Sequence, residues 1–211
     1  MKYKRFRCHL IQRSCTEKYK DYHQYLRYLA KDFGNRCAYC NTIDNIMSQN
    51  FVVDHFIPRK YFINTDREEL EIDYNNLMYS CPKCNIAKSS QYDGDINDGT
   101  YNNNYFYNPI DTNYDEIFFR NEFGTILSDD TKGKDMIIRL KLFSPIYNLA
   151  FLIEEIKNTL AKIKIKIDKT SDIKEKQYYD EAYIKLNEYL LDLQNLFNCN
   201  YYKNSVKIKA D

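Results

Sequence analysis

Apolar side chains recur at helical spacing near the start of the chain. Within residues 17–33 they fall at every third or fourth position, at Tyr22, Tyr25, Leu26, Leu29 and Phe33. This spacing is typical of a helix that packs one face against a core. Thr16 is a suitable N-terminal cap, and Gly34 is a suitable stop because glycine readily takes the backbone conformation that follows a helix. We therefore expect a helix over residues 17–33.

The last third of the chain carries two longer stripes of the same kind. The first follows Ser144-Pro145, a capping residue and a proline that together favour a helix start, and it extends to residue 167. Polar residues 168–172 interrupt the pattern, and a second stripe then extends from Tyr179 to Phe197. Two long helices joined by a short polar turn predict an antiparallel helical hairpin. Such a hairpin either packs onto the rest of the protein or offers a surface for a partner.

Between these segments the pattern is shorter and more mixed. Phe51-Val52-Val53 is typical of a strand, residues 91–104 are polar and rich in Gly, Asn and Asp, and residues 105–127 combine aromatic side chains with turn signals. These features predict an α+β protein. We expect a basic N-terminal segment with a helix at 1–34, a core at 35–92, a loop-rich extension at 93–143, the helical hairpin at 144–199 and a tail at 200–211.

Charge is distributed unevenly, although the formal net charge is only +1. Residues 1–30 contain eight basic and two acidic side chains, residues 93–130 contain nine acidic side chains and one arginine, and residues 131–170 contain nine basic and four acidic ones. Two basic segments on either side of an acidic one permit a phosphate-binding face. Solvated helix surfaces would produce the same pattern.

No apolar run approaches the roughly 18 residues that a transmembrane helix needs, so we expect no membrane association. The charged start, Met1-Lys2-Tyr3-Lys4-Arg5, lacks the apolar stretch of a secretory signal. These features predict a cytoplasmic protein. In a reducing compartment, spaced cysteines are more often metal ligands than disulfides, and the chain has seven cysteines.

Four of these cysteines form two Cys-x2-Cys pairs, Cys37 with Cys40 and Cys81 with Cys84. A two-residue spacer lets both sulfurs of a pair reach one ion, and four thiolates suit tetrahedral Zn²⁺. The pairs therefore predict a structural zinc site without an open coordination position, against the alternative of four unpaired buried thiols. Cys8, Cys15 and Cys199 lack this spacing, and we expect them to be ordinary thiols.

Further chemical groups lie between and after the cysteine pairs. Asp54-His55 follows the predicted strand, Asn76-Leu77 precedes the second pair, and Asn85 and Lys88 follow it. Cys-x2-Cys, Asp-His-x-x-Pro, Asn-Leu and Cys-x2-Cys-Asn-x2-Lys over residues 35–92 resemble, in order and spacing, the HNH endonucleases, whose catalytic core is the ββα-metal fold. Neighbouring residues of a regular strand point to opposite faces, so the strand has to bend or end at Asp54-His55 if both are to serve one site.

The resemblance implies a role for each matching residue. His55 corresponds to the general base, Asn76 to the asparagine that orients the loop bearing the base, Asp54 and Asn85 to ligands of a catalytic divalent cation, and the four cysteines to structural zinc ligands. Many members have histidine at the position of Asn85. An amide oxygen suits a hard cation better than imidazole does, so Mg²⁺ or Mn²⁺ is expected. In this fold the cation lies between the two β-strands and a helix, which we expect to begin near Asn85. The N-terminus of that helix would face the phosphate.

The resemblance also implies a function and partners. It predicts a metal-dependent endonuclease that hydrolyses phosphodiester bonds, with DNA as substrate and RNA as the alternative. Arg59, Lys60 and Lys88 are candidate contacts to backbone phosphates. Stretches such as Asn108-Pro109 and residues 136–140 more loosely resemble HNH nuclease components of bacterial anti-phage systems such as Septu. That likeness implies an ATPase partner subunit or self-association through the helical hairpin.

Two other interpretations of the same residues compete with an enzyme. One is a catalytically inactive, zinc-stabilised module that binds nucleic acid or assembles with other proteins. The other is a structural zinc-ribbon adaptor, which gives the Asp54-His55 pair no special role. The presence of the whole set of Asp54, His55, Asn76 and Asn85 favours the nuclease, because a degenerate nuclease typically loses at least one of them.

Overall fold

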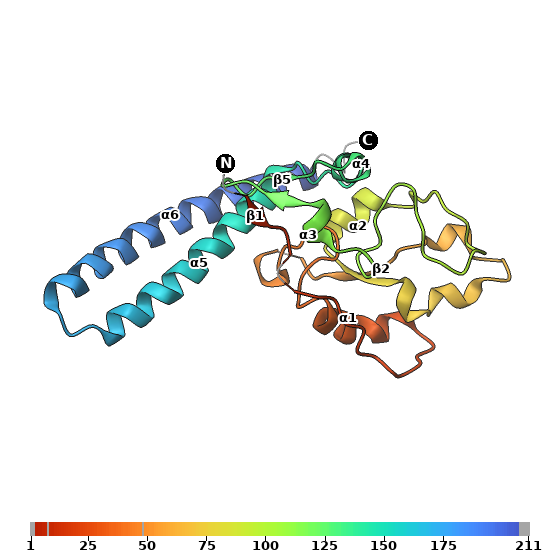
Figure 1. Ribbon diagram of the computed structural model, residues 1–211, viewed down its shortest axis with the longest axis horizontal. Coiled ribbons are helices and arrows are strands. Elements are labelled where there is room, and N and C mark those ends of the chain that lie inside the picture. Colours follow the sequence, from red (N-terminus) through yellow and green to blue (C-terminus); the bar gives the residue numbers. More distant parts are fainter. Residues whose placement is uncertain (1–2, 8, 48, 207–211) are drawn as a thin grey trace. The chain divides into compact units, whose positions relative to one another are not determined.

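The structure is a computed structural model that describes residues 3–7, 9–47 and 49–206, coloured along the chain in Figure 1. The chain divides into two compact units, Met1–Phe143 and Ser144–Asp211. Cys8, and residues 207–211 of the expected tail, lie outside the described residues. None of the helices in the described part is both long enough and apolar enough to span a bilayer.

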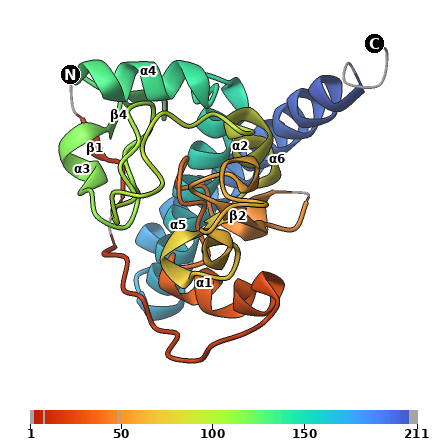
Figure 2. The same cartoon turned by 90° about the vertical axis from the view of Figure 1, so that its right-hand side faces the viewer.

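A two-stranded antiparallel sheet organises the first unit. β2 (Val52–His55) pairs with β3 (Leu77–Ser80), so that Val52 lies opposite Ser80 and His55 opposite Leu77. α1 (Leu26–Asp32) contacts both strands and α2 (Pro82–Lys88) contacts β2, which places the sheet between the two helices (Figures 1 and 2). All four residues of β3 are buried, because α1 and α2 cover the two-stranded sheet from both sides. The arrangement confirms the expected α+β class with a ββα core.

The N-terminal helix is shorter than its sequence pattern predicts. A 3-10 turn, η1 (Tyr22–Tyr25), leads into α1, and Asp21 rather than Thr16 provides the cap, since its side chain accepts the backbone N–H two residues later. The helix ends as expected. Gly34 has a φ of +60°, and hydrogen bonds from the N–H groups of Gly34 and Asn35 satisfy carbonyls of the last turn.

Residues 91–104 contain neither helix nor strand, as their polar composition predicts. A second small antiparallel sheet has the order β1-β4-β5 and consists of β1 (Lys4–Arg5), β4 (Phe119–Arg120) and β5 (Ile126–Leu127). The remaining helical segments of the first unit are η2 (Asp44–Ile46), η3 (Arg59–Tyr61), η4 (Glu68–Glu71), η5 (Tyr74–Asn76), α3 (Tyr114–Ile117) and α4 (Thr131–Arg139).

The second unit is the helical hairpin that the two apolar stripes predict. α5 (Pro145–Lys169) begins at the expected Ser-Pro start, and α6 (Ile173–Val206) returns beside it after a three-residue turn, as Figure 1 shows. α6 continues to Val206, past the expected boundary at residue 199. Buried positions on the two helices include Ile156, Leu160, Ile167, Leu193 and Phe197, all members of the predicted stripes.

Candidate active site and metal centre

Four cysteine sulfurs from two separate segments meet inside the first unit. Cys37 and Cys40 follow α1, Cys81 and Cys84 stand at the start of α2, and their Sγ atoms all lie within 4.8 Å of one another. All four residues are buried. The Sγ atoms of Cys40 and Cys81 are 3.9 Å apart. A tetrahedron with Zn–S bonds of about 2.3 Å has edges of about 3.8 Å, so the donor set and its spacing fit a zinc ion.

Local backbone structure explains why each two-residue spacer brings its sulfurs together. The loop of Cys37 and Cys40 closes through hydrogen bonds of Asn41 N–H to the Cys37 carbonyl and of Cys37 N–H to the Thr42 carbonyl, both 3.0 Å long. Cys81 is the N-cap of α2, and its Sγ accepts the N–H of Cys84 at 3.4 Å.

The chemistry of the cluster also points to a cation. Burial, and hydrogen bonding with the neighbouring sulfurs, raise the pKa of Cys81 and Cys84 well above that of an ordinary thiol, whereas hydrogen bonds from those sulfurs outweigh burial at Cys37 and lower its pKa. Thiolates gathered at this buried place therefore need a bound cation to compensate their charge.

Two buried arginines hold the backbone of the first cysteine pair. Arg7 donates from Nη2 to the Ala38 carbonyl at 2.5 Å, and Arg120 of β4 donates from Nη2 to the Cys40 carbonyl at 2.8 Å. Both arginines lie outside the expected core at residues 35–92. Part of the basic N-terminal segment is thus used to brace the cysteine loop rather than to present a phosphate-binding face.

Asp54, His55 and Asn85 are brought together around one cavity. β2 ends at His55, as the need for both side chains at one site predicts. The cavity has a volume of about 200 Å³ and is lined by Val53, Asp54, His55, Pro58, Arg59, Asn85 and Ser89. Its walls thus come from the end of the sheet, the following loop and helix α2.

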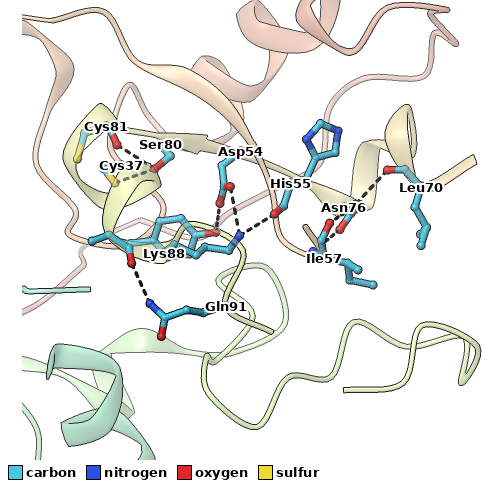
Figure 3. Close-up of polar contacts among 12 residues, drawn as sticks. Cys37, Asp54, His55, Ile57, Leu70, Asn76, Ser80, Cys81, Lys88 and Gln91 are labelled. Atoms are coloured by element: carbon cyan, nitrogen blue, oxygen red, sulfur yellow. Dashed lines mark hydrogen bonds and ion pairs between the residues drawn. The ribbon is translucent and has the colours of Figure 1, made fainter. Parts of the chain in front are cut away.

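Both carboxylate oxygens of Asp54 already have partners. The hydroxyl of Tyr39 donates to Oδ2 at 2.5 Å, and the ammonium of Lys88 lies 3.2 Å from Oδ1. Figure 3 shows the carboxylate directed toward Lys88 and the His55 ring directed away from it. Lys88 also donates to the His55 carbonyl at 2.7 Å, so one ammonium ties together the last two residues of β2.

The environment of Lys88 corrects one expectation from the sequence. We expected this side chain to contact backbone phosphates, but its exposed fraction is 0% and its ammonium is held by Asp54 and His55. Burial lowers the pKa of Lys88, and the nearby Asp54 carboxylate opposes that shift. Lys88 is therefore part of the support of the site and is not available to a nucleic acid.

The His55 ring is held by a backbone carbonyl. Its Nε2 lies 2.9 Å from the carbonyl oxygen of Glu71, and because a carbonyl can only accept, this nitrogen carries the hydrogen. In the neutral ring Nδ1 then keeps its lone pair. The ring of Tyr22 meets the imidazole edge-on, with the ring centres 4.7 Å apart. Burial lowers the pKa of His55 below the ordinary value, against the effect of the hydrogen bond to Glu71, so the ring is neutral at pH 7.

Asn76 fixes the chain that follows His55. Its Oδ1 accepts the N–H of Ile57 at 2.8 Å, and its Nδ2 donates to the carbonyls of Leu70 at 3.0 Å and Ile57 at 3.3 Å. The residue is completely buried, and its own carbonyl accepts the N–H of Phe56 at 2.8 Å. The loop that leaves the strand at His55 is thereby joined to the segment that leads into β3.

The other two candidate phosphate contacts, Arg59 and Lys60, are both exposed. Arg59 lines the cavity and forms an ion pair of 2.7 Å with Glu71, whose carbonyl holds His55. Lys60 lies beside the ring of Tyr61, with its ammonium 4.7 Å from the ring centre.

The start of α2 differs from the expected helix beginning near Asn85. The helix begins three residues earlier, at Pro82, so its first turn holds the cysteine cluster and Asn85 lies farther along the helix. In this first turn the N–H of Cys84 donates to the Cys81 sulfur. The signal was present in the sequence, because a proline is well placed at the first position of a helix.

The oxygen donors beside His55 fit a hard divalent cation. Asp54 and Asn85 line the same cavity and offer a carboxylate and an amide oxygen, the ligand types that Mg²⁺ and Mn²⁺ prefer. Each oxygen of the Asp54 carboxylate retains a second lone pair beyond its contact with Tyr39 or Lys88. The Asp54 carboxylate can therefore bind an ion while it keeps its contacts with Tyr39 and Lys88.

Comparison with known proteins agrees with this geometry. Residues 37–91 match the family model described as HNH endonuclease. The chain is also 33% identical over 85 residues to the Septu protein PtuB of Bacillus mycoides (strain KBAB4), an alignment that covers 36% of this chain and 28% of that protein. The chain thus matches less than a third of the relative's length. No solved structure matched with significance. Residues 37–91, which contain the four cysteines, Asp54, His55, Asn76 and Asn85, are an HNH endonuclease domain.

Proposed function

We propose that this protein is a metal-dependent endonuclease that hydrolyses phosphodiester bonds in DNA. The observation that carries the proposal is the cavity of about 200 Å³, whose lining includes His55, Asp54 and Asn85 together. His55 is the base, Asp54 and Asn85 are the ligands of Mg²⁺ or Mn²⁺, and the four cysteines hold a structural zinc ion.

The geometry assigns a task to each side chain. His55 removes a proton from the attacking water with Nδ1, since its Nε2–H is fixed on the Glu71 carbonyl. Asn76 holds the loop after His55, and the exposed Arg59 places a positive charge at the cavity for a backbone phosphate. A cation on Asp54 and Asn85 would act as a Lewis acid toward the phosphate. Zinc with four thiolates has no open position, so it supports the fold only.

The similarity to a Septu protein supports a role in anti-phage defence. On this proposal the nuclease acts together with an ATPase partner or a second copy of the chain, and the α5–α6 hairpin provides the contact surface. The cytoplasmic location, expected because the sequence shows neither a membrane-spanning run nor a secretory signal, stays a prediction.

The competing proposal is an inactive module that retains the zinc-stabilised fold. It finds less support, because the His55 ring is neutral, its tautomer is fixed by the Glu71 carbonyl, and Asp54 and Asn85 line the same cavity. An inactive module has no need for these three features together.

The test is a cleavage assay on supercoiled plasmid with the purified, zinc-loaded chain. We expect nicked or linear products with Mg²⁺ or Mn²⁺, and none after EDTA treatment. His55→Ala should abolish cleavage while zinc content and the circular dichroism spectrum stay unchanged. His23→Ala is the matched control, because His23 is an exposed histidine outside the cavity, and it should cleave like wild type. Equal cleavage by His55→Ala and wild type would refute the base assignment. A folded wild type that cleaves with neither cation would favour the inactive module.

A further inference from the structure

Tyr39 connects the cysteine cluster to the proposed catalytic cation site. It lies inside the first Cys-x2-Cys pair, immediately before Cys40, and its side chain is completely buried. Its hydroxyl donates to Oδ2 of Asp54 at 2.5 Å, across a separation of 15 residues. The loop that holds two of the four sulfurs therefore also holds the carboxylate proposed to bind the cation.

The other contacts of Asp54 show that the hydroxyl is not needed to compensate its charge. Lys88 already supplies a buried positive charge at Oδ1 and has no exposed surface of its own. The Tyr39 hydroxyl instead restricts the orientation of the carboxylate. Tyr39 donates to one oxygen and Lys88 to the other, and together they fix the rotation about the Cβ–Cγ bond of Asp54.

We propose that Tyr39 is a positioning residue that orients the Asp54 carboxylate for the divalent cation and thereby couples the zinc loop to the cleavage site. The inference rests on the proposed function, in which Asp54 is a cation ligand. Outer partners of a ligating carboxylate commonly contribute a factor of 10–100 to metal affinity or activity. The loop whose cysteines would hold zinc would thereby orient, through Tyr39, a carboxylate that would hold the second ion.

The chain offers a matched pair of variants for the test. Tyr39→Phe removes only the hydroxyl and keeps the buried ring. Tyr79→Phe removes a hydroxyl that donates at 2.8 Å to a different carboxylate, Asp44, and is the control. Neither variant removes a cysteine. Zinc content by elemental analysis and the thermal unfolding midpoint show whether each variant is folded and loaded.

Mn²⁺ binding to the full zinc-loaded chain is measured by electron paramagnetic resonance, without nucleic acid and up to millimolar Mn²⁺. We expect Tyr39→Phe to raise the Mn²⁺ dissociation constant by roughly 10–100-fold, with normal zinc content, and Tyr79→Phe to leave it unchanged. In the cleavage assay Tyr39→Phe should lower kcat and leave the KM for DNA unchanged. A merely structural hydroxyl would affect the unfolding midpoint and leave Mn²⁺ affinity alone.

Asp54→Ala distinguishes a failure of the positioning role of Tyr39 from a failure of the proposed cation site. If Asp54→Ala loses Mn²⁺ binding but Tyr39→Phe binds Mn²⁺ as wild type does, the positioning role is overturned and the proposed cation site stands. If Asp54→Ala binds Mn²⁺ like wild type, or if wild type shows no saturable binding, the cation site itself is wrong and the inference fails with it.

Discussion

Asn76 accepts the backbone N–H of Ile57 at 2.8 Å, although the two residues are 19 positions apart in the sequence. This hydrogen bond joins the two ends of the segment between β2 and β3, two residues after His55. Two further bonds from the same amide, to the carbonyls of Leu70 and Ile57, make this side chain the common partner of three backbone groups. The position of the histidine therefore depends on an asparagine that does not line the cavity.

Asn76→Ala should destabilise the protein strongly, because it leaves buried backbone groups without partners. Each such group costs about 1–3 kcal/mol. We expect a loss of roughly 2–5 kcal/mol in the free energy of unfolding, measured by urea denaturation of the zinc-loaded chain. Asn75→Ala is the control, since Asn75 is exposed, and it should stay within about 0.5 kcal/mol of wild type. Similar values for the two variants would contradict the role of the three hydrogen bonds.

The features that the sequence predicts correctly are those that spacing alone determines. A Cys-x2-Cys pair brings two sulfurs within reach of one ion in almost any loop, and the four sulfurs do meet. Apolar stripes and a Ser-Pro start likewise specify a helical hairpin, because helix periodicity is local. The alternation of side chains along a strand also requires β2 to bend or end at Asp54-His55 if both serve one site, and β2 ends at His55.

The features that the sequence does not reveal depend on contacts between distant segments. A lysine at the end of a short helix is usually solvated, and only the fold shows that Lys88 is enclosed with Asp54. Tyr39, Arg7 and Arg120 carry no local signal of their roles, because their partners lie 15, 31 and 80 residues away. Their contributions follow from tertiary packing, which no residue pattern in this chain specifies.

Loss of one cysteine of the cluster should unfold the first unit. Cys81→Ser removes both a proposed zinc ligand and the sulfur cap of α2. Because structural zinc binding contributes on the order of 10 kcal/mol in small zinc modules, we expect loss of bound zinc and of cooperative thermal unfolding. Elemental analysis and calorimetry provide the two measurements. Cys199→Ser, at an exposed position on α6, should retain zinc and the wild-type midpoint. Normal zinc content in Cys81→Ser would rule out a four-thiolate site.

His9 should make the protein less stable in mild acid. Burial, aided by the nearby charge of Arg7, lowers the pKa of His9 from 6.5 to about 4. Below about pH 6.5 the His9 ring therefore binds a proton in the unfolded chain but stays neutral in the folded chain. The free energy of unfolding falls as the pH is lowered from there to about 4. In His9→Gln this contribution is absent, so its unfolding free energy should fall less between pH 7 and pH 4.5 than that of wild type. Parallel pH profiles in urea denaturation would contradict the assignment.

Arg59 should contribute one phosphate contact to DNA binding. It is exposed and lines the cavity, so a backbone phosphate beside His55 can displace its partner Glu71. Arg59→Ala should weaken binding equally for unrelated sequences and reduce the slope of log K against log salt by about 0.9. Fluorescence anisotropy with a labelled duplex at several salt concentrations measures both quantities. Arg67→Ala, which removes an arginine paired with Glu69 outside the cavity, should leave the slope unchanged.

Lys88 follows Asp54 by 34 residues, yet its ammonium is what fastens the end of β2. During translation the histidine leaves the ribosome well before this lysine does. A truncated chain that ends between His55 and Cys81 contains His55, Cys37 and Cys40. It lacks Cys81, Cys84 and the Lys88 ammonium. Incomplete chains of this protein are therefore expected to lack the proposed cleavage activity.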